Sequence, residues 1–269
     1  MQTLEEKYEV LKSIIRNYGR VGIAFSGGVD STFLLKVAHD NLGDSAVAFT
    51  AAQRSVPAFE LKEADAFCKA EGIRQIVCEI NELETKEFVT NPDNRCYYCK
   101  KNVLSRICSE AQKLGIMHIA EGSNVDDLGD FRPGRKAVEE FGVSSPLLEA
   151  GLSKAEIREL SRQLDLPTWD KPAYACLASR IVRGETITEE KLRMIEKAEG
   201  FLMENGFRQM RVRLHGDLAR IEVPPENIAE LVHPDLRSTI TKKFKELGFR
   251  YISLDLDGYK MGSMNPTET

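Results

Sequence analysis

Several kinds of residue are scarce in this chain, and each shortage excludes a class of protein. One tryptophan and four histidines occur among 269 residues, and the net charge at pH 7 is −5. A small acidic excess argues against a broad nucleic-acid surface. No apolar run approaches the roughly 18 residues that a membrane-spanning helix needs, and the first residues do not resemble a signal peptide. We therefore expect a cytoplasmic protein that contacts neither a membrane nor nucleic acid.

The six cysteines are informative because no export signal accompanies them. Proteins of reducing compartments seldom hold structural disulfides, so we expect thiols. Cys68, Cys78 and Cys108 fall on apolar faces of expected helices or strands. We expect these three to be small core residues.

The other three cysteines lie in different surroundings. Cys96 and Cys99 have CxxC spacing, which suits half of a zinc site, a redox pair or two ligands of an iron–sulfur cluster. The residues leave all three possibilities open. Cys176 follows a proline-broken stretch and precedes Ser179 and Arg180. We expect an exposed loop here, in which Arg180 helps to hold the Cys176 thiolate.

Apolar strands alternate with amphipathic helices through the first part of the chain, and the composition is that of a globular protein. The expected helices cover residues 4–18, 31–42, 57–70 and 97–114, and the expected strands cover 21–25, 46–50, 75–78 and 117–120. This alternation predicts an α/β fold, with a parallel sheet that has helices on both faces. Ligands of such sheets bind at the carboxyl ends of the strands.

The order of elements changes in the second part of the chain. Ser153 and Glu156 predict a capped helix that ends at residue 164, and two prolines then break regular structure at 166–172. Beyond them we expect a helix at 188–205, a hairpin of 209–214 and 218–223, a broken helix at 228–247 and a strand at 251–255. We therefore predict an α/β domain at 1–166 and a smaller α+β domain at 167–269.

A short polar loop stands between the first expected strand and the helix after it. Its functional residues are Ser26, Gly27, Gly28, Asp30 and Ser31. In this setting backbone N–H groups and the helix dipole capture phosphate. The serines add hydroxyl donors, and Asp30 is suited to Mg²⁺ or to orienting a nucleotide. The Walker A lysine is missing, so a different phosphate chemistry is expected.

A second polar segment spans residues 123–134 and lacks regular periodicity. It contains Asp126, Asp127, Asp130 and Arg132. Such a segment is either a solvated turn or a functional loop, and we interpret it as functional.

Two arginines alternate along one expected strand of the second domain. Arg211 and Arg213 project from the same face, where two guanidinium groups form a clamp for phosphate or carboxylate. The alternative is a solvated edge strand. On the paired strand, Arg220 and Glu222 also share a face, and they either orient the clamp or pair with each other.

The loop at 26–31 resembles the SGGxDS loop of the PP-loop ATP pyrophosphatases, which typically cleave ATP between its α and β phosphates. Four further motifs, DFRPG at 130–134, CLASR at 176–180, RVRLHGDLARIEVP at 211–224 and GFRYISLDLDGY at 248–259, make nearly the whole chain similar to the LarE family. The resemblance implies an ATP-dependent sulfur transferase of nickel-pincer nucleotide biosynthesis. Such an enzyme adenylates a carboxylate of pyridinium-3,5-biscarboxylic acid mononucleotide, releases pyrophosphate and forms a thiocarboxylate.

The resemblance also assigns roles to residues. The ATP phosphates fall to the loop, with Asp30 as a catalytic residue and Mg²⁺ as the accompanying ion. The substrate falls to Ser179, Arg180, Arg211 and Arg213, with Glu199 and Glu222 as supporting carboxylates. Family members tend to form homohexamers, so a homo-oligomer is expected.

The sulfur source distinguishes two variants of the family. Some members consume a single cysteine near the Ser-Arg pair, here Cys176, and leave dehydroalanine. This chain also has Cys96 and Cys99, and so resembles the variant whose three thiolates hold a [4Fe–4S] cluster. The open iron of that cluster binds sulfide from a separate sulfide donor. The resemblance therefore favours the cluster, with Cys176 as both a catalytic residue and a ligand.

Other functions share some of these features. A tRNA-thiolating PP-loop enzyme would also use cysteines, but the acidic balance argues against it. A synthetase of the amidotransferase type would need the loop but not the CxxC pair or Cys176. An iron–sulfur or zinc carrier that binds nucleotide as a regulator is the non-enzymatic alternative.

Overall fold

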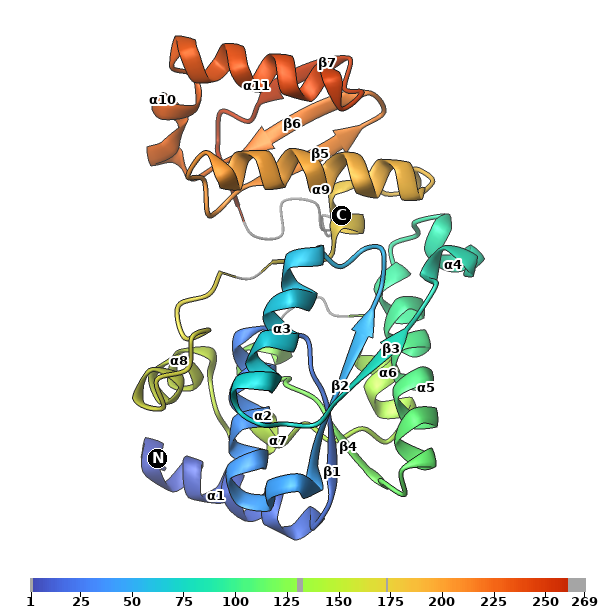
Figure 1. Cartoon of the computed structure of the whole chain (residues 1–269), viewed down its shortest axis with the longest axis vertical. Coiled ribbons are helices and arrows are strands. Elements are labelled where there is room, and N and C mark those ends of the chain that lie inside the picture. Colours follow the sequence, from blue (N-terminus) through green and yellow to red (C-terminus); the bar gives the residue numbers. More distant parts are fainter. Residues whose placement is uncertain (1, 130–132, 173, 261–269) are drawn as a thin grey trace. The chain divides into compact units, whose positions relative to one another are not determined.

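The computed structural model describes residues 2–129, 133–172 and 174–260 and divides into two compact units (Figure 1). The first unit is Met1–Glu82 with Asn94–Ala173, and the second is Leu83–Asp93 with Tyr174–Thr269. The second unit thus takes a short segment from the first half of the chain.

The first unit contains a four-stranded parallel sheet of order β3-β2-β1-β4. Its strands are β1 Val21–Ala24, β2 Ala46–Ala52, β3 Gln75–Glu79 and β4 His118–Ala120. Its helices are α1 Leu4–Tyr18, α2 Val29–Leu42, α3 Ala58–Ala70, α5 Arg95–Lys113, α6 Arg135–Glu140, α7 Pro146–Glu149 and α8 Lys154–Gln163. Short 3-10 turns, among them η3 Val125–Gly129, connect some of these elements.

Both faces of this sheet are covered by helices. Ala46 and Ala48 of β2 belong to a core that includes residues of α1, α2 and α3, whereas Val47 and Phe49 belong to a core that includes residues of α5 and α6. Successive strand residues point to opposite faces, so this alternation places one core on each side. The predicted α/β fold class is confirmed.

Most of the elements expected in the first part of the chain form, with small differences at their ends. α1 has the expected bounds, and α8 begins with the predicted capping box of Ser153 and Glu156. α2 begins at Val29, two residues earlier than expected, because Gly28 is its N-cap. Asp30 and Ser31 consequently lie inside the first helical turn. α5 begins at Arg95, so Cys96 also lies in a first turn.

The second unit contains a three-stranded sheet of order β5-β6-β7, whose first pair is antiparallel and whose second pair is parallel. Its strands are β5 Arg211–His215, β6 Leu218–Glu222 and β7 Tyr251–Leu254. Its helices are α4 Lys86–Val89, α9 Glu189–Glu204, α10 Ile228–Leu231 and α11 Pro234–Glu246. The expected broken helix at 228–247 is therefore α10 and α11, separated just before Pro234.

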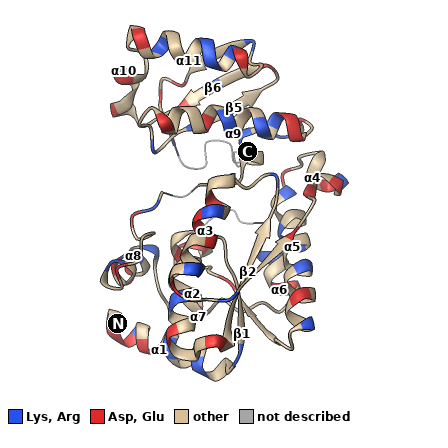
Figure 2. Ribbon diagram, viewed as in Figure 1, with Lys and Arg blue, Asp and Glu red and all other residues tan. Residues whose placement is uncertain are grey.

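Acidic and basic residues are interspersed along α9 and α11 of the second unit (Figure 2). Across the part of the chain that the structure describes, no helix combines the length and apolar character needed to span a bilayer.

Candidate active site

The loop between β1 and α2 is held by its own serines. Ser26 donates its backbone N–H to Ser31 Oγ (3.2 Å), and the two hydroxyl oxygens lie 3.1 Å apart. Ser31 Oγ in turn donates to the carbonyl of Gly28 (3.3 Å). Gly28 caps α2 without a side-chain hydrogen bond. The N-terminal turn of α2 is therefore presented at the carboxyl end of β1, as a phosphate-binding loop requires.

A glycine from the neighbouring strand braces this loop. β4 lies beside β1, and Gly122 is the second residue after β4. A Cβ at Gly122 would lie 3.0 Å from the backbone nitrogen of Ser31 and 3.1 Å from Cβ of Asp30. Both distances are shorter than nine in ten real Cβ contacts, so a larger residue at position 122 would require the loop to move.

Both carboxylate oxygens of Asp30 have partners. Lys154 Nζ, from the first residue of α8, lies 2.5 Å from Oδ2, and Asn124 Nδ2 donates to Oδ1 (3.3 Å). Asp126 accepts the backbone N–H of Lys154 (2.6 Å), and Asp127 accepts that of Asn124 (3.0 Å). The described part of segment 123–134 is thus hydrogen-bonded to α8 and, through Asn124, to the loop. Asp130 and Arg132 lie outside the described residues.

The proline-broken segment at 166–172 also reaches the loop. Lys171 Nζ donates to the carbonyl of Gly27 (3.0 Å) and pairs with Glu63 (2.7 Å). Arg158 of α8 donates to the carbonyls of Trp169 (2.5 Å) and Lys171 (2.9 Å). The end of this segment is therefore fixed to the first unit by α8.

A buried carboxylate lies at the end of β4. Glu121 accepts hydrogen bonds from Ser145 Oγ (2.8 Å), the backbone N–H of Ser123 (3.0 Å) and Lys100 Nζ (3.4 Å). Burial raises the pKa of Glu121, but the charge of Lys100 and the serine donors lower it more, so that the pKa lies below its usual value. Lys100 comes from α5, one turn after Cys96. Glu121 therefore connects the helix that carries the CxxC pair to the end of the strand beside the loop.

All six cysteines are free thiols, as expected. Cys68 and Cys78 are buried in the core and Cys108 is half-buried. Burial raises the pKa of all three thiols, and raises that of Cys68 to about 12, with a smaller contribution from the nearby Asp65. These thiols are therefore unreactive at neutral pH.

The CxxC pair lies at the start of α5 and differs from the core cysteines. Cys96 is exposed and Cys99 is half-buried, and Gln53 Nε2 donates to Cys99 Sγ (3.4 Å). Cys176 is half-buried and belongs to the second unit. Within residues 2–129, 133–172 and 174–260, no three acidic, cysteine or histidine side chains are arranged to hold a metal ion. The three-thiolate site remains a prediction.

In the second unit, Arg180 is buried and bonded to Glu199. Its Nε and Nη2 each lie 2.9 Å from a Glu199 oxygen, and Nη1 donates to the carbonyls of Ala175 and Cys176. Glu199 also accepts the backbone N–H of Val212 (2.9 Å). We expected Arg180 to hold the Cys176 thiolate. In the described residues it holds the backbone of the Cys176 loop, because Glu199 draws the guanidinium inward.

Arg213 and Arg220 share the carboxylate of Glu222. Arg213 Nη2 lies 2.9 Å from Oε2, and Arg220 Nη2 lies 3.0 Å from Oε1. Arg213 also donates to the carbonyl of Ser179 (3.3 Å). Of the two roles expected for Glu222, it fills both, since it pairs with Arg220 and orients Arg213.

Arg211 lies over the ring of Tyr259, with 5.0 Å between the guanidinium carbon and the ring centroid. Burial lowers the pKa of Arg211, and the nearby charge of Arg180 lowers it further. Arg211 and Arg213 are only 3% and 5% exposed, so a solvated edge strand is wrong for these two positions. Both side chains are cations that are shielded from solvent.

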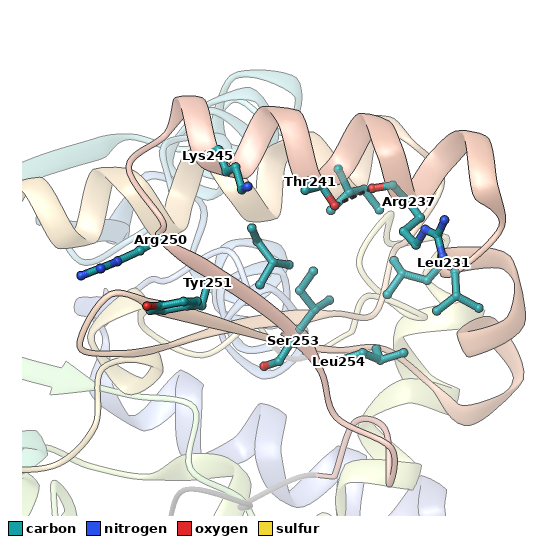
Figure 3. A pocket seen from close by; sticks show the side chains of 12 residues that line it. Leu231, Arg237, Thr241, Lys245, Arg250, Tyr251, Ser253 and Leu254 are labelled. Carbon is teal, nitrogen blue, oxygen red and sulfur yellow. Dashed lines mark hydrogen bonds between the residues drawn. The ribbon is translucent and has the colours of Figure 1, made fainter.

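The second unit also has an open pocket of about 430 Å³ between α11 and β7 (Figure 3). Its lining is mostly apolar, with the cations of Arg237, Lys245 and Arg250. None of the residues predicted to bind substrate lines it. This pocket is therefore separate from the arginine cluster of β5.

No family model matches this chain. The chain is 36% identical over 271 residues to pyridinium-3,5-bisthiocarboxylic acid mononucleotide synthase of Lactiplantibacillus plantarum, covering all of this chain and 97% of that protein. The chain belongs to the LarE family. Two uncharacterised proteins are also similar to this chain. One is from Synechocystis (44% over 262 residues, 97% of this chain and 98% of that protein), and the other is from Methanocaldococcus jannaschii (29% over 257 residues, 96% of this chain and 94% of that protein).

Four residues of this LarE-family chain were missed by sequence reasoning. They are Gln53, Lys100, Glu121 and Lys154. Gln53 and Lys154 come close to the expected site residues Cys99 and Asp30 only through the tertiary fold, at separations of 46 and 124 residues. Glu121 contacts Lys100, the chain neighbour of Cys99, at a separation of 21 residues. A general signal was available for Glu121 and Gln53, since both follow strands at the ligand-binding edge of a parallel sheet.

Glu121→Gln should lower the free energy of unfolding at neutral pH by about 1–3 kcal/mol. The reason is that hydrogen bonds to a buried carboxylate are stronger than hydrogen bonds to a neutral amide. The folded-state pKa of Glu121 is lowered, so its contribution is present above the ordinary value of 4.5 and is lost as the pH falls through the folded-state pKa. Urea denaturation across this range should show the difference between variant and wild type narrowing below pH 4.5. Glu5→Gln, at an exposed position of α1, is the control, and a difference that stays constant with pH would contradict the assignment.

Proposed function

We propose that this LarE-family protein is an ATP-dependent sulfur transferase that acts on pyridinium-3,5-biscarboxylic acid mononucleotide. The observation that carries the proposal is full-length similarity to a synthase of the corresponding bisthiocarboxylic acid mononucleotide. The hydrogen-bonded loop at the N-terminus of α2 supports the ATP half of the reaction. The buried arginines of β5 support the binding of an anionic substrate.

In the first step a carboxylate oxygen of the substrate attacks the α-phosphorus of ATP. The bond between the α-phosphorus and the bridging oxygen breaks, and pyrophosphate leaves with that electron pair. The N–H groups and serine hydroxyls of residues 26–31 would hold the phosphates. Asp30, in the first turn of α2, would supply a carboxylate to Mg²⁺ beside the phosphate oxygens, and the ion would neutralise their charge.

In the second step sulfide attacks the acyl carbon, and AMP leaves with the electron pair of the broken carbon–oxygen bond. The acyl-adenylate makes this possible, because a free carboxylate oxygen is a poor leaving group. Water is a competing nucleophile, so the activated acid must be protected from solvent.

Arg211 and Arg213 would bind the phosphate of the mononucleotide or its adenylate. Two paired guanidinium groups on one strand suit the charge and geometry of phosphate. Arg180 is already bonded to Glu199, which we assign a supporting role, while Glu222 orients Arg213. Ser179 Oγ accepts from Arg180 Nη1 (3.2 Å), which places the hydroxyl at the same cluster.

For the sulfur source we propose a [4Fe–4S] cluster held by Cys96, Cys99 and Cys176. The two thiols at the start of α5, with Gln53 donating to one of them, fit a pair of thiolate ligands. Such a cluster would supply an iron at which sulfide from a donor can bind. The alternative is that Cys176 gives up its own sulfur and becomes dehydroalanine.

Wild-type protein supplied with the acid substrate and Mg²⁺ should convert ATP to AMP and pyrophosphate. Asp30→Asn should slow this by at least about tenfold, the loss expected for one charge-assisted contact. Asp40→Asn, on the same helix and paired with Lys36, is the matched control. Formation of ADP and phosphate, or an Asp30→Asn enzyme of normal rate, would show that the loop does not act as proposed.

Anaerobically reconstituted protein should bind about four irons per chain and show the visible absorption of a cluster. Cys96→Ser, Cys99→Ser and Cys176→Ser should each lose the cluster. Cys108→Ser, on the same helix as the CxxC pair, should keep it.

Intact-mass measurement after turnover tests the alternative sulfur source. The alternative predicts a chain that is lighter by one H₂S at Cys176, formed without iron and without Cys96 or Cys99. This outcome would reject the cluster and support the sacrificial cysteine. Repeated turnover with added sulfide and an unchanged chain mass supports the cluster.

A further inference from the structure

We propose that Lys154 binds the phosphates of ATP that leave as pyrophosphate. The inference rests on the proposed function, because it assigns a further residue to the ATP half of that reaction. Lys154 lies outside the five motifs that carry the family resemblance and follows Asp30 by 124 residues.

The fold fixes Lys154 beside the loop. It is the first residue of α8, whose start is set by the capping box of Ser153 and Glu156. Its backbone N–H donates to Asp126 (2.6 Å), while its Nζ reaches Asp30 at 2.5 Å. The side chain is 34% exposed and that of Asp30 is 24% exposed. The ammonium group is therefore held at the first turn of α2, where the loop would collect phosphate.

The ammonium group of Lys154 has N–H donors that remain available to a ligand. An ammonium group carries three N–H donors, and among the described residues the acceptor found for Lys154 Nζ is Asp30. The other lysine at the loop, Lys171, already has two acceptors, the carbonyl of Gly27 and the carboxylate of Glu63. Of these two lysines, Lys154 is the one able to bridge Asp30 and a phosphate.

Charge makes this bridge useful during the reaction. A phosphate at the N-terminus of α2 lies close to the Asp30 carboxylate, and the two negative groups repel each other. As the bond to the α-phosphorus breaks, further negative charge develops on the leaving pyrophosphate. An ammonium group already in place offsets both effects without a rearrangement at the moment of reaction.

The test is calorimetric titration with inorganic pyrophosphate in the presence of Mg²⁺. Lys154→Met should weaken binding by about tenfold or more, the effect of losing one charge-assisted hydrogen bond. Lys36→Met removes the same charge from α2, where Lys36 pairs with Asp40 and Glu71, and should bind as wild type does. Lys154→Arg keeps the charge and should restore most of the affinity, which a folding defect at this position would not allow.

A second pair of titrations separates phosphate binding from neutralisation of Asp30. In an Asp30→Asn background there is no carboxylate to neutralise, so Lys154→Met should still weaken pyrophosphate binding by a similar factor. Loss of the effect in this background would overturn the proposal, as would unchanged affinity in Lys154→Met or no binding by the wild type. The titration needs no acid substrate. Failure of the wild type to form AMP would therefore reject the proposed function separately.

Discussion

The parallel pairing of β1 with β4 is the constraint on which the first unit's candidate site depends. It brings the loop after β1 against Gly122, where a Cβ would lie only about 3 Å from atoms of Asp30 and Ser31. Asn124 then reaches Asp30, and Asp126 fixes the start of α8 beside it. One strand pairing thus places a loop, its carboxylate and a lysine from a distant helix together, while Glu121 extends the same edge toward the CxxC helix.

The second unit buries several arginine side chains. Removing a guanidinium group from water is costly unless a carboxylate compensates it. Glu199 compensates Arg180 and Glu222 compensates Arg213, and each also contacts a second group of the cluster. Side chains held in this way need little reorganisation to receive an anion. The repulsion between the guanidinium groups is therefore already offset in the folded protein, before an anion binds.

Local patterns in the sequence were sufficient for much of this description. Alternation of apolar residues predicted the sheet, and the capping box predicted the start of α8. Contacts set by tertiary structure could not be read in the same way. Nothing near Lys154 indicates Asp30 as its partner, and nothing in the composition of 83–93 assigns this segment to the second unit. We likewise expected Arg180 to lie at the Cys176 thiol. Its ion pair with Glu199 depends on how α9 packs, which local sequence patterns do not show.

The proposed reaction exchanges a carboxylate oxygen of the mononucleotide for sulfur. The most direct measurement is the accurate mass of the substrate after incubation of the reconstituted protein with pyridinium-3,5-biscarboxylic acid mononucleotide, ATP, Mg²⁺ and sulfide. We expect a product in which one oxygen is replaced by one sulfur, formed only when ATP is present. Recovery of the dicarboxylic acid unchanged, with ATP consumed or not, would contradict it.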